Sequence, residues 1–189
     1  MAQGAFLDKN ESGFGFGAST LRSQAYGEAQ YAGILNFGYS ISGGFDIQGS
    51  YGPIFNSSVK RVSNIWSIGG TAHILKESNK PIGLAATLAY SKQNNTVNGL
   101  ALDITHFGLS IYRTVLGTPQ DKKILLSTHA SYNQSHLGWV DNFPVIGMAI
   151  DFVRKTPKGS LITFGPHISY NLDRNIATYG IGISLIRSH

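Results

Sequence analysis

The feature that most constrains this chain is an alternation of apolar with small or polar residues, which recurs in about ten runs along the sequence. The last run shows it most clearly: apolar Ala177, Tyr179, Ile181, Ile183 and Leu185 alternate with Thr178, Gly180, Gly182 and Ser184. A β-strand sends successive side chains to opposite faces, so this run predicts a strand with one apolar face and one small, polar face. Repeated without a helical segment, the pattern predicts an all-β fold: a closed, antiparallel, up-and-down transmembrane β-barrel.

About ten strands are expected, with eight or twelve as alternatives. They are placed at about residues 12–21, 28–39, 44–51, 61–75, 82–91, 100–114, 123–133, 145–154, 161–172 and 176–186. The expected connections alternate in length, with longer ones after the first, third, fifth and seventh strands, among them 52–58, 92–98 and 134–143. Outer-membrane barrels have short periplasmic turns and longer outer loops, so both termini are expected in the periplasm.

Composition agrees with one transmembrane barrel domain over residues 1–189. Charged residues are only 13% of the chain, about half the share usual in soluble domains, and glycine is abundant with 23 residues. Cysteine is absent, which excludes disulfides and thiolate chemistry. The net charge of +5 forms no basic stripe interleaved with aromatics, so nucleic-acid binding is not expected. No signal peptide is visible, and residues 1–4 resemble a mature N-terminus left by signal cleavage, with a Met added.

Three stretches resemble small bacterial outer-membrane barrels of the group that includes the OmpA transmembrane domain and the OmpX-like proteins. They are the Gly/Phe alternation at Gly13–Ser19, the hairpin-like Leu35–Gly52 and the barrel-assembly-like Thr178–Leu185. The resemblance implies location in the bacterial outer membrane and insertion by the barrel-assembly machinery. The chain departs from the group in its strand count and in ending with Arg187-Ser188-His189 rather than an aromatic residue.

Polar residues on the inferred inward faces are the candidate lumen lining. They are Asp46, Gln48, His73, His106, His129, Ser131, Asp151, His167 and Ser169. The histidines fall on different strands at unlike distances from the turns, and none has metal-ligand spacing. We therefore expect neither a metal site nor a cofactor. If water fills the lumen, the inward histidines are expected to keep solvent access.

A short internal repeat, His-x-Ser-Tyr-Asn, begins at His129 and again at His167. Positions i and i+2 share a strand face, so each histidine can approach its serine, as activation of a nucleophile requires. Outer-membrane lipid A deacylases resemble this in having His-x-Ser on a strand. In that family, however, asparagine follows directly and the pair faces lipid, whereas here tyrosine intervenes. We favour the alternative that two neighbouring strands have similar polar linings.

The inward positions are mostly Gly, Ser, Thr and Ala, which would leave a ten-stranded barrel emptier than an eight-stranded one. The sequence therefore predicts a monomeric barrel, in contact with membrane lipid or detergent, that is a small non-specific pore or a structural protein and not an enzyme. A lipid-modifying enzyme and a soluble, lipocalin-like ligand carrier are the alternatives. The low charge and the apolar outer faces argue against the carrier.

Overall fold

A computed structural model describes residue 7 and residues 10–25, 28–56, 63–77, 81–95, 101–117, 122–136 and 140–189. The ten strands are β1 (Gly13–Ala25), β2 (Glu28–Ile41), β3 (Phe45–Asn56), β4 (Ser63–Leu75), β5 (Gly83–Asn95), β6 (Ala101–Gly117), β7 (Lys122–Ser135), β8 (Phe143–Lys155), β9 (Leu161–Asn171) and β10 (Ile176–Ser188). Residues 1–4, expected to form a mature N-terminus, lie outside the described residues.

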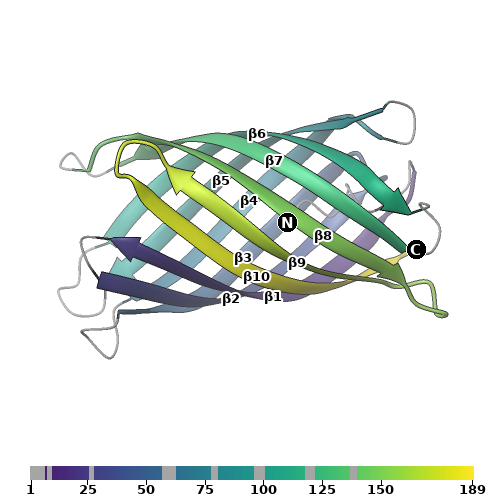
Figure 1. Ribbon diagram of the computed structural model, residues 1–189, viewed down its shortest axis with the longest axis horizontal. Helices are drawn as coiled ribbons and strands as arrows, with labels where there is room; N and C mark the ends of the chain where they lie inside the picture. Colours follow the sequence, from purple (N-terminus) through teal and green to yellow (C-terminus); the bar gives the residue numbers. More distant parts are fainter. Residues whose placement is uncertain are drawn as a thin grey trace.

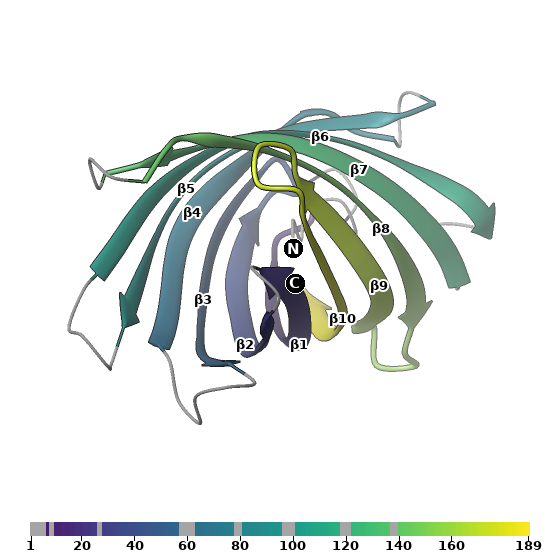
Figure 2. The same ribbon diagram turned by 60° about the vertical axis from the view of Figure 1, so that its left-hand side comes forward.

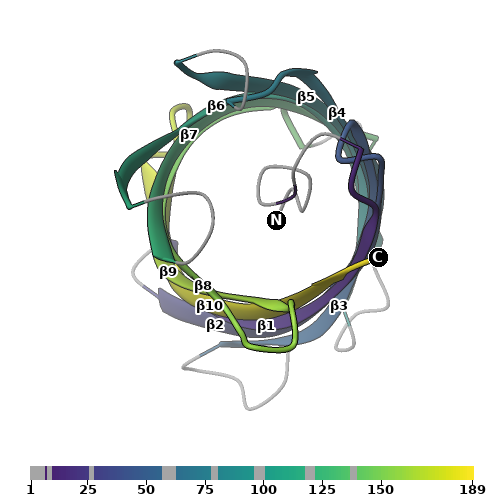
Figure 3. The ribbon, with the colours of Figure 1, turned by 90° about the vertical axis from the view of Figure 1, so that its right-hand side faces the viewer.

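Each strand pairs antiparallel with the next, and β1 closes the sheet by pairing with β10. Closure is in register from Gly13 opposite Ser188 to Ser23 opposite Thr178. The strands are strongly tilted, as Figure 1 shows, and they form a complete ring when viewed along the barrel (Figure 3). Closure leaves no unpaired sheet edge, which a lipid environment requires. The predicted fold class and the count of ten are confirmed.

The outer surface is a continuous apolar belt. On β10, Tyr179, Ile181, Ile183 and Leu185 are 41%, 42%, 53% and 50% exposed, and each of the other strands exposes at least one large apolar side chain. A surface so apolar on all sides is not stable in water, so the barrel spans a lipid bilayer. The face assignments from the sequence are confirmed, and a soluble carrier is excluded.

The part of the chain that the structure describes contains no helix with the length and apolar character of a membrane span.

Two predictions about the connections are wrong. The first outer link, between Ala25 and Glu28, is two residues long, and β3 continues to Asn56 through most of the predicted loop 52–58. Likewise β5 continues to Asn95, so the expected alternation of long and short connections is not observed. The strands extend beyond the residues with alternating apolar side chains, because the hydrogen bonds between strands need only backbone groups. Gln93, for example, pairs with Ile65 on β4 and with Leu102 on β6. Residues 137–139 of the predicted loop 134–143 lie outside the described residues.

The turn between β2 and β3 has the left-handed backbone that a tight hairpin needs. Ser42 and Gly43 have φ angles of 51° and 58°, which bring β2 directly back along β3. Figure 2 shows how such connections fold the strands into an up-and-down order. Serine as well as glycine therefore adopts a positive φ at this turn.

At the end of the barrel where β10 ends, the interior contains a group of buried apolar side chains. The buried cluster consists of Leu7, Ala85, Tyr112, Leu125, Val153, Leu161 and Ile186. Leu7 precedes β1 and is not part of the wall, yet it is only 4% exposed. We call this set the apolar cluster. It lies toward one end of the barrel, whereas the middle of the barrel is lined mostly by small and polar residues.

Candidate functional site: the barrel lumen

The middle of the lumen is hollow. A cavity of about 570 Å³ is bounded by residues of all ten strands, most of them Gly, Ala, Ser or Thr. A volume of 300–1,000 Å³ is typical of small-molecule sites. The small lining residues explain the hollow, because a ten-stranded barrel is wider than one whose interior its own side chains fill.

The structure divides the nine predicted lumen residues into two sets. Those lining the cavity are Gln48, His106, His129, Ser131, Asp151 and His167. Ser169 also faces inward, opposite Gly147 of β8 and Thr178 of β10. Asp46 and His73 do not reach the cavity, because they are packed against the wall near the end of the barrel where β10 ends.

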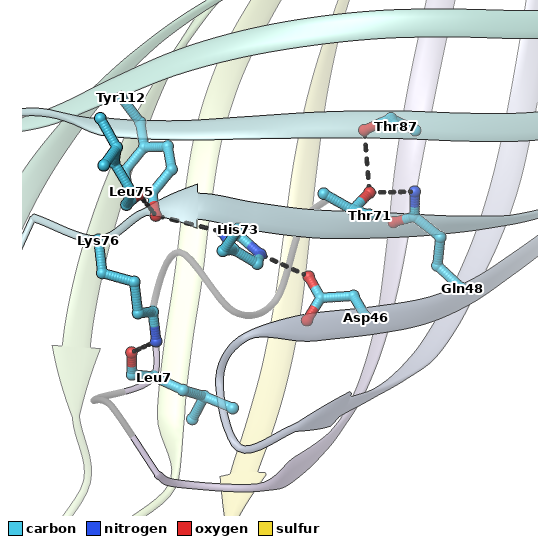
Figure 4. Close-up of polar contacts among 9 residues, drawn as sticks. All are labelled: Leu7, Asp46, Gln48, Thr71, His73, Leu75, Lys76, Thr87 and Tyr112. Carbon is cyan, nitrogen blue, oxygen red and sulfur yellow. Dashed lines mark hydrogen bonds and ion pairs between the residues drawn. The ribbon is translucent and has the colours of Figure 1, made fainter.

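Asp46 and His73 form the start of a buried polar network (Figure 4). Nε2 of His73 lies 3.1 Å from Oδ2 of Asp46, and Nδ1 lies 3.1 Å from the hydroxyl of Tyr112, which donates to the carbonyl of Leu75 at 3.3 Å. The side chains of His73 and Asp46 are 0% and 1% exposed. The expectation that His73 keeps solvent access is therefore wrong, since Tyr112 and Asp46 enclose its ring.

The same end holds Leu7 in place. Nζ of Lys76 donates to the carbonyl of Leu7 at 2.7 Å, and a Cβ at Gly13 would lie 3.0 Å from Cδ1 of Leu7. Figure 4 shows Lys76 reaching Leu7 beside the His73 network. The hydrogen bond from Lys76 thus holds Leu7, which belongs to no strand, in its place within the apolar cluster.

Hydroxyl and amide groups cross-link the strands around the cavity. Thr71 Oγ1 lies 2.9 Å from Oγ1 of Thr87 and accepts a bond from Gln48 Nε2 at 3.4 Å. Ser50 and Ser67 hydroxyls are 2.7 Å apart. These hydroxyl groups bond to one another across the sheet, so they line the wall without filling the lumen.

The repeated His-x-Ser pairs do not form catalytic dyads. The ring of His129 lies over Gly147 and that of His167 over Gly180: a Cβ at either glycine would be 2.7 Å from Nε2 of the histidine. Each glycine is directly opposite its histidine on the next strand. Because glycine has no side chain, the imidazole ring occupies the space above it. The ring therefore leans across the sheet and not along its own strand toward Ser131 or Ser169.

A histidine on a third strand makes the contacts that the repeats lack. Nε2 of His106 lies 2.7 Å from the hydroxyl of Ser91, and Nδ1 bonds to Oδ1 of Asn133. Ser91 and Asn133 are 4% and 3% exposed, while His106 lines the cavity. Sequence reasoning identified His106 but missed Ser91 and Asn133. The available signal was that all three stand on inward faces of consecutive strands, β5, β6 and β7.

Metal ligands do not assemble in the described ranges: no three His, Asp or Glu side chains there come together as a group that could hold an ion.

Comparisons with family models and with curated proteins find no match to this chain. Solved structures are similar. The β domain of the Bordetella autotransporter BrkA has a TM-score of 0.56 at 13% identity, over 94% of this chain and 99% of that one. The outer-membrane protease OmpT of Escherichia coli has a TM-score of 0.47 at 9% identity, over 96% and 97%. An anion-selective porin from Comamonas acidovorans has 0.35 at 10% identity, over 89% and 59%.

The likeness to the autotransporter domain establishes the fold. This chain has the fold of bacterial outer-membrane β-barrels. The other two scores are too low to add to that conclusion.

The prediction that the chain is not an enzyme is wrong insofar as it excluded any catalytic role. The barrels matched include a protease. The likeness assigns no activity to this chain, because only 9% of the residues are identical. Catalysis has to be judged from the side chains of the lumen itself.

Proposed function

We propose that this protein is a narrow pore for small hydrophilic solutes in the bacterial outer membrane, with both termini on the periplasmic side. The observation that carries the proposal is the cavity of about 570 Å³ along the middle of the lumen. A barrel that served only as a membrane anchor would gain stability by filling this space with side chains. The grouping with OmpA and OmpX-like barrels stays a prediction.

The lining favours passage of small polar solutes. Around the cavity, serine and threonine hydroxyls, the imidazoles of His129 and His167 and the amide of Gln48 offer hydrogen bonds without a dense set of fixed charges. Such a lining replaces part of a solute's hydration and imposes little selectivity beyond size. The proposed pore is therefore non-specific.

The apolar cluster is the proposed constriction. Leu125 belongs both to this cluster and to the cavity lining, and it is 1% exposed. Apolar constrictions in pores resist wetting, so conductance through the wild-type barrel should be small. Loss of side-chain volume at Leu125 should widen and wet the narrowest section.

The test is single-channel conductance in planar bilayers, comparing wild type with Leu125→Ala. Leu126→Ala is the matched control, because the next residue on β7 faces lipid. We expect small openings for wild type, larger ones for Leu125→Ala and wild-type openings for Leu126→Ala. If no variant conducts although each is verified as folded, the lumen is closed and the barrel has a structural role.

A further inference from the structure

The three side chains of Ser91, His106 and Asn133 have the connectivity of a nucleophile, a base and a group that orients the base. We propose that they form a hydrolase site in the lumen wall, which cleaves short-acyl carboxylic esters that enter the cavity. Ser91 and His106 are the catalytic residues, and Asn133 is a positioning residue.

The hydrogen-bond directions follow from Asn133. Its Nδ2 donates to the carbonyl of Phe143 at 3.2 Å and to the hydroxyl of Ser131 at 3.4 Å. Oδ1 therefore faces His106 as an acceptor, and Nδ1 of His106 must carry the proton. Nε2 is then the free acceptor of the neutral ring, and the Ser91 hydroxyl donates to it. This is the tautomer that a general base needs to activate a serine.

Strand register explains why the three residues meet. His106 is directly opposite Ala89 on β5 and Asn133 on β7, while Ser91 is two residues beyond Ala89 on the same face. Diagonal neighbours in an antiparallel pair are about 7–8 Å apart, which an imidazole ring spans. The methyl group of Ala89 leaves the ring room to lean toward Ser91.

The same register separates this site from the His-x-Ser repeats. At His129 and His167 the opposing residue is glycine, and the ring crosses to the next strand. Only His106, among these three histidines, has a serine hydroxyl at one ring nitrogen and a side-chain amide at the other in the described contacts.

The proposed reaction is ester hydrolysis through an acyl-enzyme. Ser91 Oγ attacks the ester carbonyl carbon while its proton passes to Nε2 of His106. The bond from that carbon to the alkoxy oxygen breaks, and the alcohol leaves with the proton from Nε2. Water then attacks the acyl-Ser91 carbonyl and gives a proton to Nε2. Release of the carboxylic acid returns this proton to Ser91 Oγ.

The cavity sets the substrate class. His106 lies on the cavity lining, whereas Ser91 is 4% exposed and lies behind it, so an ester carbonyl reaches Ser91 from the cavity only by passing the His106 ring. A space of about 570 Å³ with the apolar cluster toward one end accommodates a short acyl group. The site should therefore prefer acetyl and butyryl esters to long-chain or branched esters.

The test uses the refolded barrel and a small alkyl fluorophosphonate probe, which phosphonylates an activated serine and releases fluoride. We expect the wild-type protein to be labelled, with mass spectrometry placing the adduct on Ser91. Ser91→Ala should abolish that adduct, and His106→Gln should slow labelling by at least about 100-fold, the lower end of general-base contributions. Ser67→Ala is the control, because Ser67 is opposite Ser91 but bonds to Ser50.

Asn133 is tested by rescue. Asn133→Leu removes the acceptor for Nδ1–H of His106, whereas Asn133→Asp keeps an oxygen there. We expect the leucine variant to lower kcat for p-nitrophenyl butyrate with little change in KM, and the aspartate variant to recover a large part of kcat. A residue that served only packing would not give this order, since both variants lose the Nδ2 bonds.

Failure to form a Ser91 adduct on the folded wild-type barrel would overturn the proposal. So would ester hydrolysis that Ser91→Ala leaves unchanged, or labelling that Ser67→Ala removes equally. Pore conductance is measured separately, so either function can fail without the other.

Discussion

Arginine placed at two consecutive positions of β6 should have opposite consequences. Leu109 is the central residue of β6, and 56% of it is exposed on the outer face. Ser110 follows it and lines the cavity. The guanidinium of Leu109→Arg would lie near the bilayer midplane, where arginine on the lipid face costs about 2–4 kcal/mol. This corresponds to a loss of roughly 30- to 900-fold in the folding equilibrium constant.

Ser110→Arg introduces the same side chain into the hollow lumen, where water can solvate the charge. We expect it to cost much less, although His129 is directly opposite on β7. Urea titration of both variants in phospholipid vesicles, followed by tryptophan fluorescence and by heat-modifiable gel mobility, gives the two free energies of unfolding. Wild-type stability for Leu109→Arg together with a severe loss for Ser110→Arg would refute the face assignment.

Two further predictions concern the interior. Gly83→Ala should destabilise the barrel by about 1–3 kcal/mol, since the new Cβ overlaps the ring of Tyr112, which is 4% exposed and bonded to His73. Gly49→Ala meets the ring of Phe37, which is 51% exposed and can swing into lipid, so urea titration should show a smaller loss; equal losses would contradict this reasoning. If the barrel conducts, protonating the lumen histidines by lowering the pH should shift reversal potentials toward anion selectivity. His129→Gln with His167→Gln should flatten the shift, whereas His73→Gln should not, because His73 is sealed in the wall; a shift that survives the double change would exclude these histidines.

The faces of the strands could be predicted because the alternation is a local property. Ile181 and Ile183 differ from Gly180 and Gly182 in the sequence itself, and the two-residue period of a strand converts that difference directly into outside and inside. The strand ends could not be predicted in this way. Beyond the lipid, polar residues such as Gln93 continue the backbone ladder, and the apolar signal stops before the strand does.

The site was only partly predictable, because its contacts depend on register between strands. His106 was identified from its inward position, but its partners are 15 residues before it and 27 residues after it. Which residue of β5 lies diagonal to His106 is fixed by the length of the hairpin, which alternation does not reveal. The His-x-Ser repeat raised Ser131 and Ser169 as partners of the neighbouring histidines, although similar polar linings were the favoured interpretation. The opposing glycines turn those rings across the sheet.

The claim that a water-accessible lumen runs inside an apolar belt is tested most directly on four consecutive residues of β8. The natural chain has no cysteine, so single cysteines can be placed at positions 148–151 without background. Met148 and Ile150 are 46% and 39% exposed on the outer face, while Ala149 and Asp151 line the cavity. A charged, water-soluble thiosulfonate reagent reacts with thiolates, which require water, so modification rates in proteoliposomes report which face is wet. We predict fast modification at 149 and 151 and slow modification at 148 and 150. Equal rates at all four positions, or fast modification at 148 and 150 alone, would contradict the account.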